Sequence, residues 1–192
     1  TGGYLTCAIV HLKKQAKNVK ERKSIEENIA GWEYKPLPYL LATTNLILHD
    51  IEIPNIKFGD ALEQPLSNFT EKHRVNVILA NPPFGAQRDQ ESYPDVWGEF
   101  SKESETTILF VKLMFEQLKA GGKCAVVVSE GFHTWDQFSA KALRKMLLDE
   151  VQLKAVISLP QGLFVSKSGQ GPKTSILIFE KGGKTDWTWF YK

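Results

Sequence analysis

Short apolar runs and longer amphipathic segments alternate along the whole chain. The short runs are rich in β-branched residues, which is typical of strands in a parallel sheet. The longer segments carry apolar residues three and four positions apart, which is typical of helices that pack on one face. Strands are predicted near residues 28–33, 55–59, 74–80, 124–128, 153–157, 175–179 and 188–191. Helices are predicted over about 4–20, 37–48, 105–119 and 138–150.

Because strands and helices alternate, the predicted fold class is α/β, with a doubly wound and mostly parallel sheet. The unbroken apolar run 124–128 predicts a central strand covered on both faces, and Gly121 and Gly122 are expected to end the helix before it. The last two strands are expected to close the sheet with antiparallel pairing. The second helix is expected to bury one face, formed by Leu37, Leu40, Leu41, Thr44 and Leu48.

The chain opens on Thr1-Gly2-Gly3, and no strand precedes the two glycines. In a doubly wound fold the strand before a glycine turn is central. We therefore expect a fragment of a longer protein, which starts inside a glycine-rich turn and lacks the first central strand. That strand is expected between the strand leading to Glu33 and the strand at 74–80.

Length and composition bound the possibilities further. The chain has 192 residues, of which 42% are apolar and 24% charged, as in an ordinary soluble protein with one domain over residues 1–192. The net charge of +2 gives no overall basic field, so a nucleic-acid role needs a local patch or a partner subunit. The basic run over 13–23 is either such a patch or a solvated helix face, and we favour the solvated face.

Two isolated cysteines, Cys7 and Cys124, argue against a disulfide framework and a zinc site, and no metal site is expected. This cysteine usage predicts a reduced, cytoplasmic protein. No apolar run is long enough to cross a membrane, so no membrane association is expected. The polar loop predicted over 86–104 is long enough for a binding loop or lid, with simple disorder as the other interpretation.

The most informative stretch is 74–85, with the sequence RVNVILANPPFG. Its apolar part predicts a buried parallel strand. Pro82 and Pro83 lack a backbone N–H and have a fixed φ, so strand pairing stops there and the chain leaves along one rigid path. Ligands bind at the carboxyl ends of strands in open α/β sheets, so Asn81 is expected in a crevice with Phe84 as an apolar face beside it. The other interpretation is an ordinary proline-rich turn.

This pattern suits chemistry on an aromatic amine, whose nitrogen is a poor nucleophile because its lone pair is delocalised into the ring. Asn81 Oδ1 and the Pro82 carbonyl oxygen can both accept hydrogen bonds from one amino group. Such a grip favours a tetrahedral nitrogen with its lone pair directed at an electrophile. Phe84 can stack on the base and hold this geometry. The predicted catalytic residues are therefore Asn81, Pro82, Pro83 and Phe84.

Three further features are typical of a nucleotide site. Gly2 and Gly3 open a helix, as in turns where the backbone approaches a ligand, although an ordinary helix start is the other interpretation. Glu33 ends a strand about thirty residues later, where an acid can accept hydrogen bonds from ribose hydroxyls. A surface glutamate is the alternative. Asp60 also follows a strand, and its carboxylate can accept from the amino group of a cofactor adenine.

Together these motifs resemble those of the modification (M) subunits of type I restriction-modification systems. These subunits are adenine-N6 DNA methyltransferases. The resemblance covers nearly the whole chain, and its segments are 1–5, 45–49, 59–62, 81–85, 118–122 and 157–164. The order, with the glycine turn before Asn-Pro-Pro-Phe, matches that family. The family's motif usually begins Asp-Pro-x-Cys-Gly before Thr-Gly-Gly. That part is absent from the chain, as are the helical N-terminal and C-terminal regions of such subunits.

The resemblance implies a Rossmann-like domain that binds S-adenosyl-L-methionine along the strand tips. The implied cofactor-binding residues are Thr1, Gly2, Gly3, Glu33, Asp60 and Asn81. Gly2 and Gly3 would lie near the methionine moiety, Glu33 at the ribose and Asp60 at the adenine. The target adenine of double-stranded DNA would be flipped into the 81–84 pocket, at an unstacking cost of roughly a few kcal/mol. A separate specificity (S) subunit would recognise the sequence, and a restriction (R) subunit is a further implied partner.

Two alternatives stay open. The same motif serves methyltransferases that act on RNA amino groups or on a glutamine amide in protein, and Phe84 in place of Tyr favours DNA, as does segment 45–49. The chain could also be a non-catalytic domain that only binds DNA or other subunits. An intact Asp/Asn-Pro-x-x-Gly turn upstream would favour the enzyme.

Overall fold

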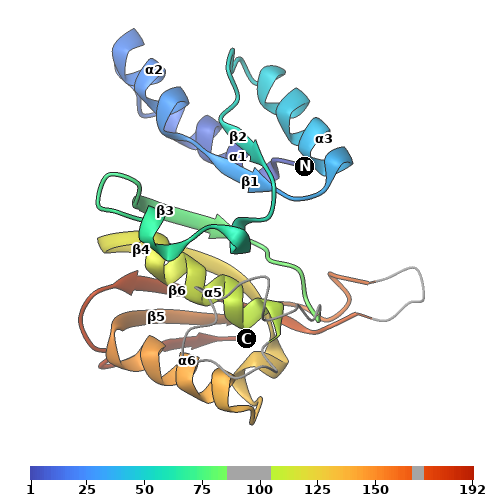
Figure 1. Ribbon diagram of the computed structural model, residues 1–192, viewed down its shortest axis with the longest axis vertical. Coiled ribbons are helices and arrows are strands. Elements are labelled where there is room, and N and C mark those ends of the chain that lie inside the picture. The colour runs from blue at the N-terminus through green and yellow to red at the C-terminus, as the bar shows by residue number, and fades with distance from the viewer. Residues whose placement is uncertain (86–104, 166–170) are drawn as a thin grey trace. The chain divides into compact units, whose positions relative to one another are not determined.

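The computed structural model describes residues 1–85, 105–165 and 171–192. The loop predicted over 86–104 lies outside the described residues. The described chain forms two compact units, Thr1–Ala61 and Leu62–Lys192, which we call the N-terminal unit and the C-terminal unit (Figure 1). The expectation of one catalytic domain over residues 1–192 stays a prediction.

In the N-terminal unit, two short strands pack with three helices (Figure 1). The helices are α1 (Gly3–Lys13), α2 (Val19–Asn28) and α3 (Pro36–Ile47). The strands β1 (Gly31–Glu33) and β2 (Ile56–Phe58) pair in parallel, as the sequence predicts. Ile9, Leu46 and Ile51 form the buried core of the unit, with Leu5, Ile29 and Ile56 packed against it.

The segment predicted as one helix over 4–20 forms parts of two helices. Its first helix ends at Lys13, and the next begins at Val19. The break lies at Asn18, which is extended and whose Oδ1 accepts a hydrogen bond from the Glu21 N–H at 2.9 Å. Asparagine in this conformation is a strong helix N-cap, so it starts a new helix instead of continuing the old one.

The predicted core face of α3 is also wrong. Leu37, Leu40 and Leu48 are exposed, whereas the helix buries Ala42 and Leu46. Both faces of this helix carry apolar residues, so the pattern alone does not choose between them. Contact of Leu46 with the Ile9 cluster turns the leucine-rich face outwards.

The C-terminal unit contains a five-stranded sheet in the order β3-β4-β6-β5-β7. Its strands are β3 (Val75–Ala80), β4 (Leu118–Ser129), β5 (Val151–Ser158), β6 (Thr174–Lys181) and β7 (Trp189–Tyr191). Only β6 runs against the others, so the mostly parallel sheet is confirmed. The antiparallel prediction is right for β6 and wrong for β7. Strand β6 runs antiparallel to β5. Because the chain reverses its direction again after β6, β7 runs parallel to β5.

Strand β3 runs parallel to β4, as predicted, but it is less buried than predicted. Val77 is 60% and Leu79 is 45% exposed, so the prediction of a buried strand is wrong for the described residues. The reason is its place at the end of the strand order, where an edge strand is paired on one side only. The expected central strand that would precede Thr1 stays a prediction.

Strand β4 confirms the predicted central strand, with Val126 and Val128 fully buried. The prediction that Gly121 and Gly122 end the preceding helix is wrong. The helix ends earlier, because Leu118 is already extended and begins β4. Gly121 has a φ of +74°, and the two glycines lie where the pairing with β3 is irregular. They therefore permit a bulge in the strand.

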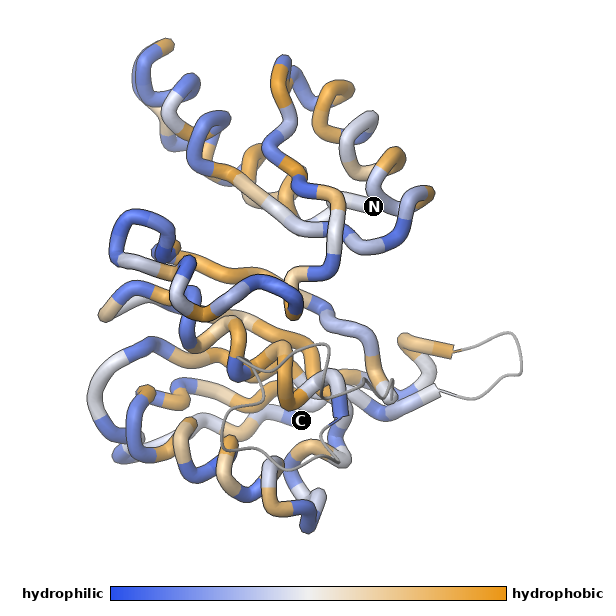
Figure 2. Tube along the Cα trace, viewed as in Figure 1, coloured by the Kyte–Doolittle hydropathy of each residue, from blue (hydrophilic) through white to orange (hydrophobic). Residues whose placement is uncertain are grey.

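Two helices cover one face of this sheet (Figure 1). Helix α5 (Thr106–Gln117) packs on β4, and α6 (Phe138–Asp149) packs on β5 and on α5. Short 3-10 helices span Ala61–Glu63, Leu66–Asn68 and Glu130–His133. Apolar residues are concentrated along α5 and the inner strands (Figure 2). The buried side chains of this core include Leu109, Val111, Leu113, Val128, Leu143, Leu147, Leu177 and Phe179.

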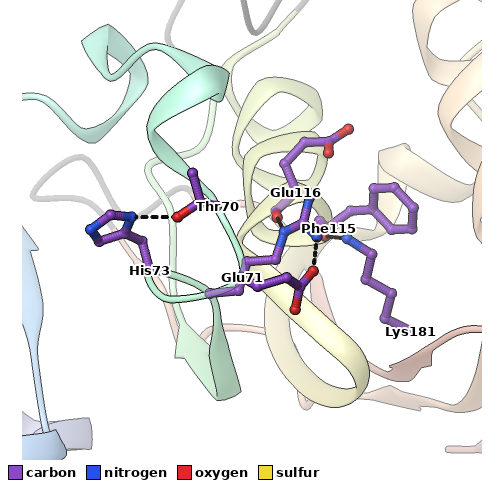
Figure 3. Close-up of polar contacts among 7 residues, drawn as sticks. Thr70, Glu71, His73, Phe115, Glu116 and Lys181 are labelled. Atoms are coloured by element: carbon purple, nitrogen blue, oxygen red, sulfur yellow. Dashed lines mark hydrogen bonds and ion pairs between the residues drawn. The ribbon is translucent and has the colours of Figure 1, made fainter.

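Cationic side chains fix the C-terminal end of α5 (Figure 3). Lys181 Nζ donates to the Phe115 carbonyl at 2.6 Å, and Arg74 Nε donates to the Glu116 carbonyl at 3.2 Å. These carbonyls have no partner within the helix, and positive charge at this end is favourable for the helix dipole. Burial lowers the pKa of Lys181. At the opposite, N-terminal end of the helix, the first residues of α5 lie at the carboxyl end of β3.

Candidate active site

The Asn-Pro-Pro-Phe-Gly turn (81–85) begins directly after the last residue of β3. Asn81 is exposed, and its amide makes no hydrogen bond with the residues that the structure describes. Pro82 is buried, and Phe84 is half-buried. Gly85 has a φ of +68°, in the left-handed region that favours glycine, so it reverses the chain after Phe84. The turn thus presents an exposed amide three residues before a half-buried aromatic ring.

Side chains at the start of α5 hold this turn in place. Glu105 Oε1 accepts a hydrogen bond from the Gly85 N–H at 2.5 Å, and Thr106 Oγ1 donates to the Pro83 carbonyl at 3.2 Å. Thr107 Oγ1 donates to the same Glu105 oxygen at 3.2 Å. Burial raises the pKa of Glu105, although the hydrogen bonds from Gly85 and Thr107 act against this. These three residues were not predicted from the sequence.

A second aromatic residue lies against Phe84. The ring of Phe164 meets it edge to face, with centroids 5.6 Å apart and planes at 75°. Phe164 belongs to the segment 157–164, which follows β5 at the same edge of the sheet. This segment carries part of the family resemblance, but no role was predicted for Phe164 from the sequence. Like Phe84, Phe164 follows a parallel strand. This position in the sequence could have been used to predict it as a site residue.

Further polar residues gather at the carboxyl ends of β4 and β5. Ser158 Oγ donates to Glu130 Oε1 at 2.5 Å, and Lys173 Nζ lies 3.2 Å from the same oxygen. The hydrogen bond from Ser158 is the main cause that lowers the pKa of Glu130. His133 Nε2 and Ser175 Oγ are 2.7 Å apart, and burial lowers the pKa of His133. The carboxyl ends of the parallel strands in the C-terminal unit therefore carry several polar side chains in addition to Asn81.

The N-terminal unit holds the other predicted site residues. Glu33 and Asp60 follow paired parallel strands, since Glu33 lies opposite Phe58 and its carbonyl accepts from the Gly59 N–H at 3.1 Å. The Glu33 carboxylate is half-buried, and its Oε1 accepts from the Lys35 N–H at 2.9 Å. Asp60 is only 5% exposed. The two acids are therefore brought to the same edge of this small sheet.

The glycine turn lies at the start of α1 in the same unit. Gly2 has a φ of +76°, and a Cβ there would meet Ala42 of α3 at 3.3 Å. At Gly3 a Cβ would meet nothing within 4 Å, so the backbone there is open to approach. The Thr1 carbonyl accepts from Asn45 Nδ2 at 3.2 Å, which ties the turn to α3. The placement of these residues relative to the 81–84 turn stays a prediction.

In 1–85, 105–165 and 171–192 no group of three or more His, Cys, Asp and Glu residues is arranged to hold a metal ion. Within the same ranges no helix is long and apolar enough to cross a bilayer. Both cysteines are free, and burial raises the pKa of Cys124 to about 12.

The family model described as N-6 DNA Methylase matches residues 1–192. The type I restriction enzyme EcoEI methylase subunit of Escherichia coli is 38% identical over an alignment of 194 positions, which covers 100% of this chain and 38% of that subunit.

Two solved structures share the fold. A modification subunit attributed to a type I restriction enzyme of Vibrio vulnificus YJ016 has a TM-score of 0.85 at 33% identity, over 99% of this chain and 40% of that chain. A chain from a type I restriction-modification system has a TM-score of 0.86 at 28% identity, over 100% of this chain and 38% of that chain. This chain therefore spans less than half the length of these relatives. With its full length matched, the Rossmann-like chain belongs to the N-6 DNA methylase family.

Proposed function

We propose that the protein is a site-specific DNA adenine-N6 methyltransferase, which transfers a methyl group from S-adenosyl-L-methionine to a flipped-out adenine as part of a restriction-modification system. The observation that carries this proposal is the 81–84 turn in a chain of this family. Asn81 offers an exposed amide with no partner among the described residues, and Phe84 follows it in the same turn at the carboxyl end of a parallel strand. An aromatic amine is the substrate that this pair suits.

Asn81 and the Pro82 carbonyl would accept hydrogen bonds from the target amino group, so that the nitrogen lone pair is freed for attack. Because Pro82 and Pro83 have no N–H, no backbone donor of these residues competes with the incoming amine for the acceptor oxygens. Phe84 would stack on the base, and Phe164, edge-on to Phe84, would limit how far that ring can shift. These contacts are stronger in the transition state than in the ground state, which is what raises a rate.

The N-terminal unit fits S-adenosyl-L-methionine. The carboxylates of Glu33 and Asp60 are acceptors only, which matches ribose hydroxyls and an adenine amino group. Gly3 leaves the backbone open, as the approach of a ligand requires, and Thr1 and Gly2 belong to the same turn. When bound, the cofactor would supply an electrophilic methyl group.

The partners follow from the same reasoning. Double-stranded DNA is the proposed substrate, and assembly with a specificity subunit and a restriction subunit is proposed from the type I relatives. The net charge of only +2 supports this, because a chain without a strong basic field needs help to hold DNA. We propose that the complex acts in the cytoplasm.

A methylation assay tests the proposal. The full-length protein, purified with its specificity subunit, is incubated with unmethylated DNA and tritiated S-adenosyl-L-methionine, and the nucleosides are then separated. N6-methyladenine is the expected product. Label found in RNA or in protein glutamine, when these are offered instead, would replace DNA as the substrate. Label in none of the three would contradict an enzymatic role.

The two acids give a second prediction. Glu33→Ala and Asp60→Asn are each expected to weaken S-adenosyl-L-methionine binding roughly tenfold or more, because a charged acceptor of cofactor hydrogens is lost. Calorimetric titration of the full-length protein measures this, with Glu52→Ala, an exposed acid of the same unit, as the matched control. Unchanged affinity in both variants would remove these acids from the cofactor site.

A further inference from the structure

The turn after β3 has little backbone support of its own. Two of its five residues are prolines, which cannot donate a hydrogen bond. Its position after the last strand residue means that no ladder pairing extends along it. A turn that must hold two acceptors and a ring within a fraction of an ångström therefore needs support from elsewhere.

That support comes from residues twenty positions later. Glu105 precedes α5, yet its carboxylate does not cap the helix; its Oε1 accepts from the Gly85 N–H and from the Thr107 hydroxyl. Thr106 is fully buried, so its hydroxyl has little rotamer freedom, and it binds the Pro83 carbonyl. The two contacts flank Phe84, one on the residue before it and one on the residue after it.

The Glu105 carboxylate is costly for the fold. Its second oxygen, Oε2, is buried and has no hydrogen-bond partner among the described residues. A buried acceptor without a partner destabilises a protein, more so when it is charged. If residue 105 served only to start the helix, Ser or Asp would stabilise the helix more, because their side chains can cap its N-terminus. The glutamate at position 105 therefore supports the contact with Gly85 at the expense of helix stability.

We propose that Glu105 and Thr106 are positioning residues for methyl transfer, which fix the backbone on both sides of Phe84. This rests on the proposed function. Neither residue need touch the base or the cofactor. Both act through the turn: they hold the Phe84 ring in its stacking place and keep the Pro82–Pro83 backbone from rotating. Loss of either contact lowers the turnover of bound substrate without changing the binding of S-adenosyl-L-methionine.

The test compares paired variants of the full-length protein with its specificity subunit. Thr106→Val keeps the shape but loses the hydroxyl, whereas Thr106→Ser keeps the hydroxyl. Glu105→Ala removes the acceptor, whereas Glu105→Gln retains an oxygen for the Gly85 N–H. Ser139→Ala is the control, because Ser139 is a fully buried hydroxyl of α6 without a hydrogen-bond partner among the described residues.

Thr106→Val and Glu105→Ala are expected to lower kcat roughly ten- to a hundredfold, with KM for S-adenosyl-L-methionine within about twofold of wild type. Thr106→Ser, Glu105→Gln and Ser139→Ala are expected to retain most of kcat. Active sites are counted by cofactor titration, so partial unfolding does not imitate a fall in kcat. A merely structural role would lower the count of sites and leave kcat per site unchanged.

The outcomes separate this inference from the proposed function. If wild type methylates DNA but Thr106→Val and Glu105→Ala keep wild-type kcat per site, the positioning role is wrong and the methyltransferase stands. If Glu105→Gln loses as much as Glu105→Ala, the hydrogen bond to Gly85 is not the role of Glu105, and that half of the inference is overturned. If wild type transfers no methyl group to DNA, the proposed function itself fails.

Discussion

Asn81→Ala in the full-length protein is expected to lower the rate of methyl transfer at least a hundredfold while leaving S-adenosyl-L-methionine binding nearly unchanged. The reason is that the Asn81 amide faces the target amine in the proposed site and contacts it most strongly in the transition state. Loss of one preorganised polar partner of a transition state typically costs about 3–4 kcal/mol, which corresponds to this factor. Asn81 is exposed, so its truncation leaves no buried cavity that would unfold the protein.

Asn76→Ala is the matched control for this experiment. Asn76 is an exposed asparagine near the start of β3, five positions before Asn81, which follows the carboxyl end of that strand. Initial rates with tritiated cofactor and saturating DNA are compared for the two variants and wild type. An Asn81→Ala variant with more than half of the wild-type rate would exclude Asn81 from the catalytic site, and equal losses in both variants would point to damage of β3.

Phe179→Ala is expected to lower the free energy of unfolding by about 3–5 kcal/mol, as for other phenylalanines deleted from cores. Phe179 is fully buried on β6, which is paired on both sides, by β4 and by β5. Deletion of the ring leaves a cavity in the middle of the sheet, where packing on both sides resists collapse.

The matched control is Phe190→Ala on β7, because this ring is 77% exposed. Its removal is expected to change the free energy of unfolding by less than about 0.5 kcal/mol, as for ordinary surface substitutions. Urea denaturation of the full-length protein, followed by circular dichroism, measures both variants. A larger loss for Phe190→Ala than for Phe179→Ala would contradict the described core.

Stretches with a strong local signal were predicted well from the sequence. β-branched runs require extended backbone, and amphipathic spacing requires a helix, so the alternation of elements and the α/β fold follow from local preference. The candidate site at 81–84 was predicted in the same way, because two prolines end a strand whatever surrounds them. The missed start of α2 at Asn18 was a local signal too, since its side-chain cap was readable in the sequence.

Contacts between distant residues were not predictable in this way. Helix α3 carries leucines on one side and Ala42 and Leu46 on another, and only packing against Ile9 selects the buried side. The bulge at Gly121 depends on the register between β3 and β4. Glu105 and Thr106 look like an ordinary helix start, and only the fold brings them to the turn twenty residues earlier.

By itself, the sequence therefore determined the alternation of strands and helices and their order, and it predicted the chemistry of the Asn-Pro-Pro-Phe turn, because these depend on covalent constraints within a few residues. The tertiary structure alone decided which apolar faces are buried, that β3 is an edge strand in the C-terminal unit, and that Phe164, Glu105 and Thr106 support Phe84 and its neighbours. Those features depend on which distant groups meet, and close packing in the core selects one of several arrangements that the local pattern permits.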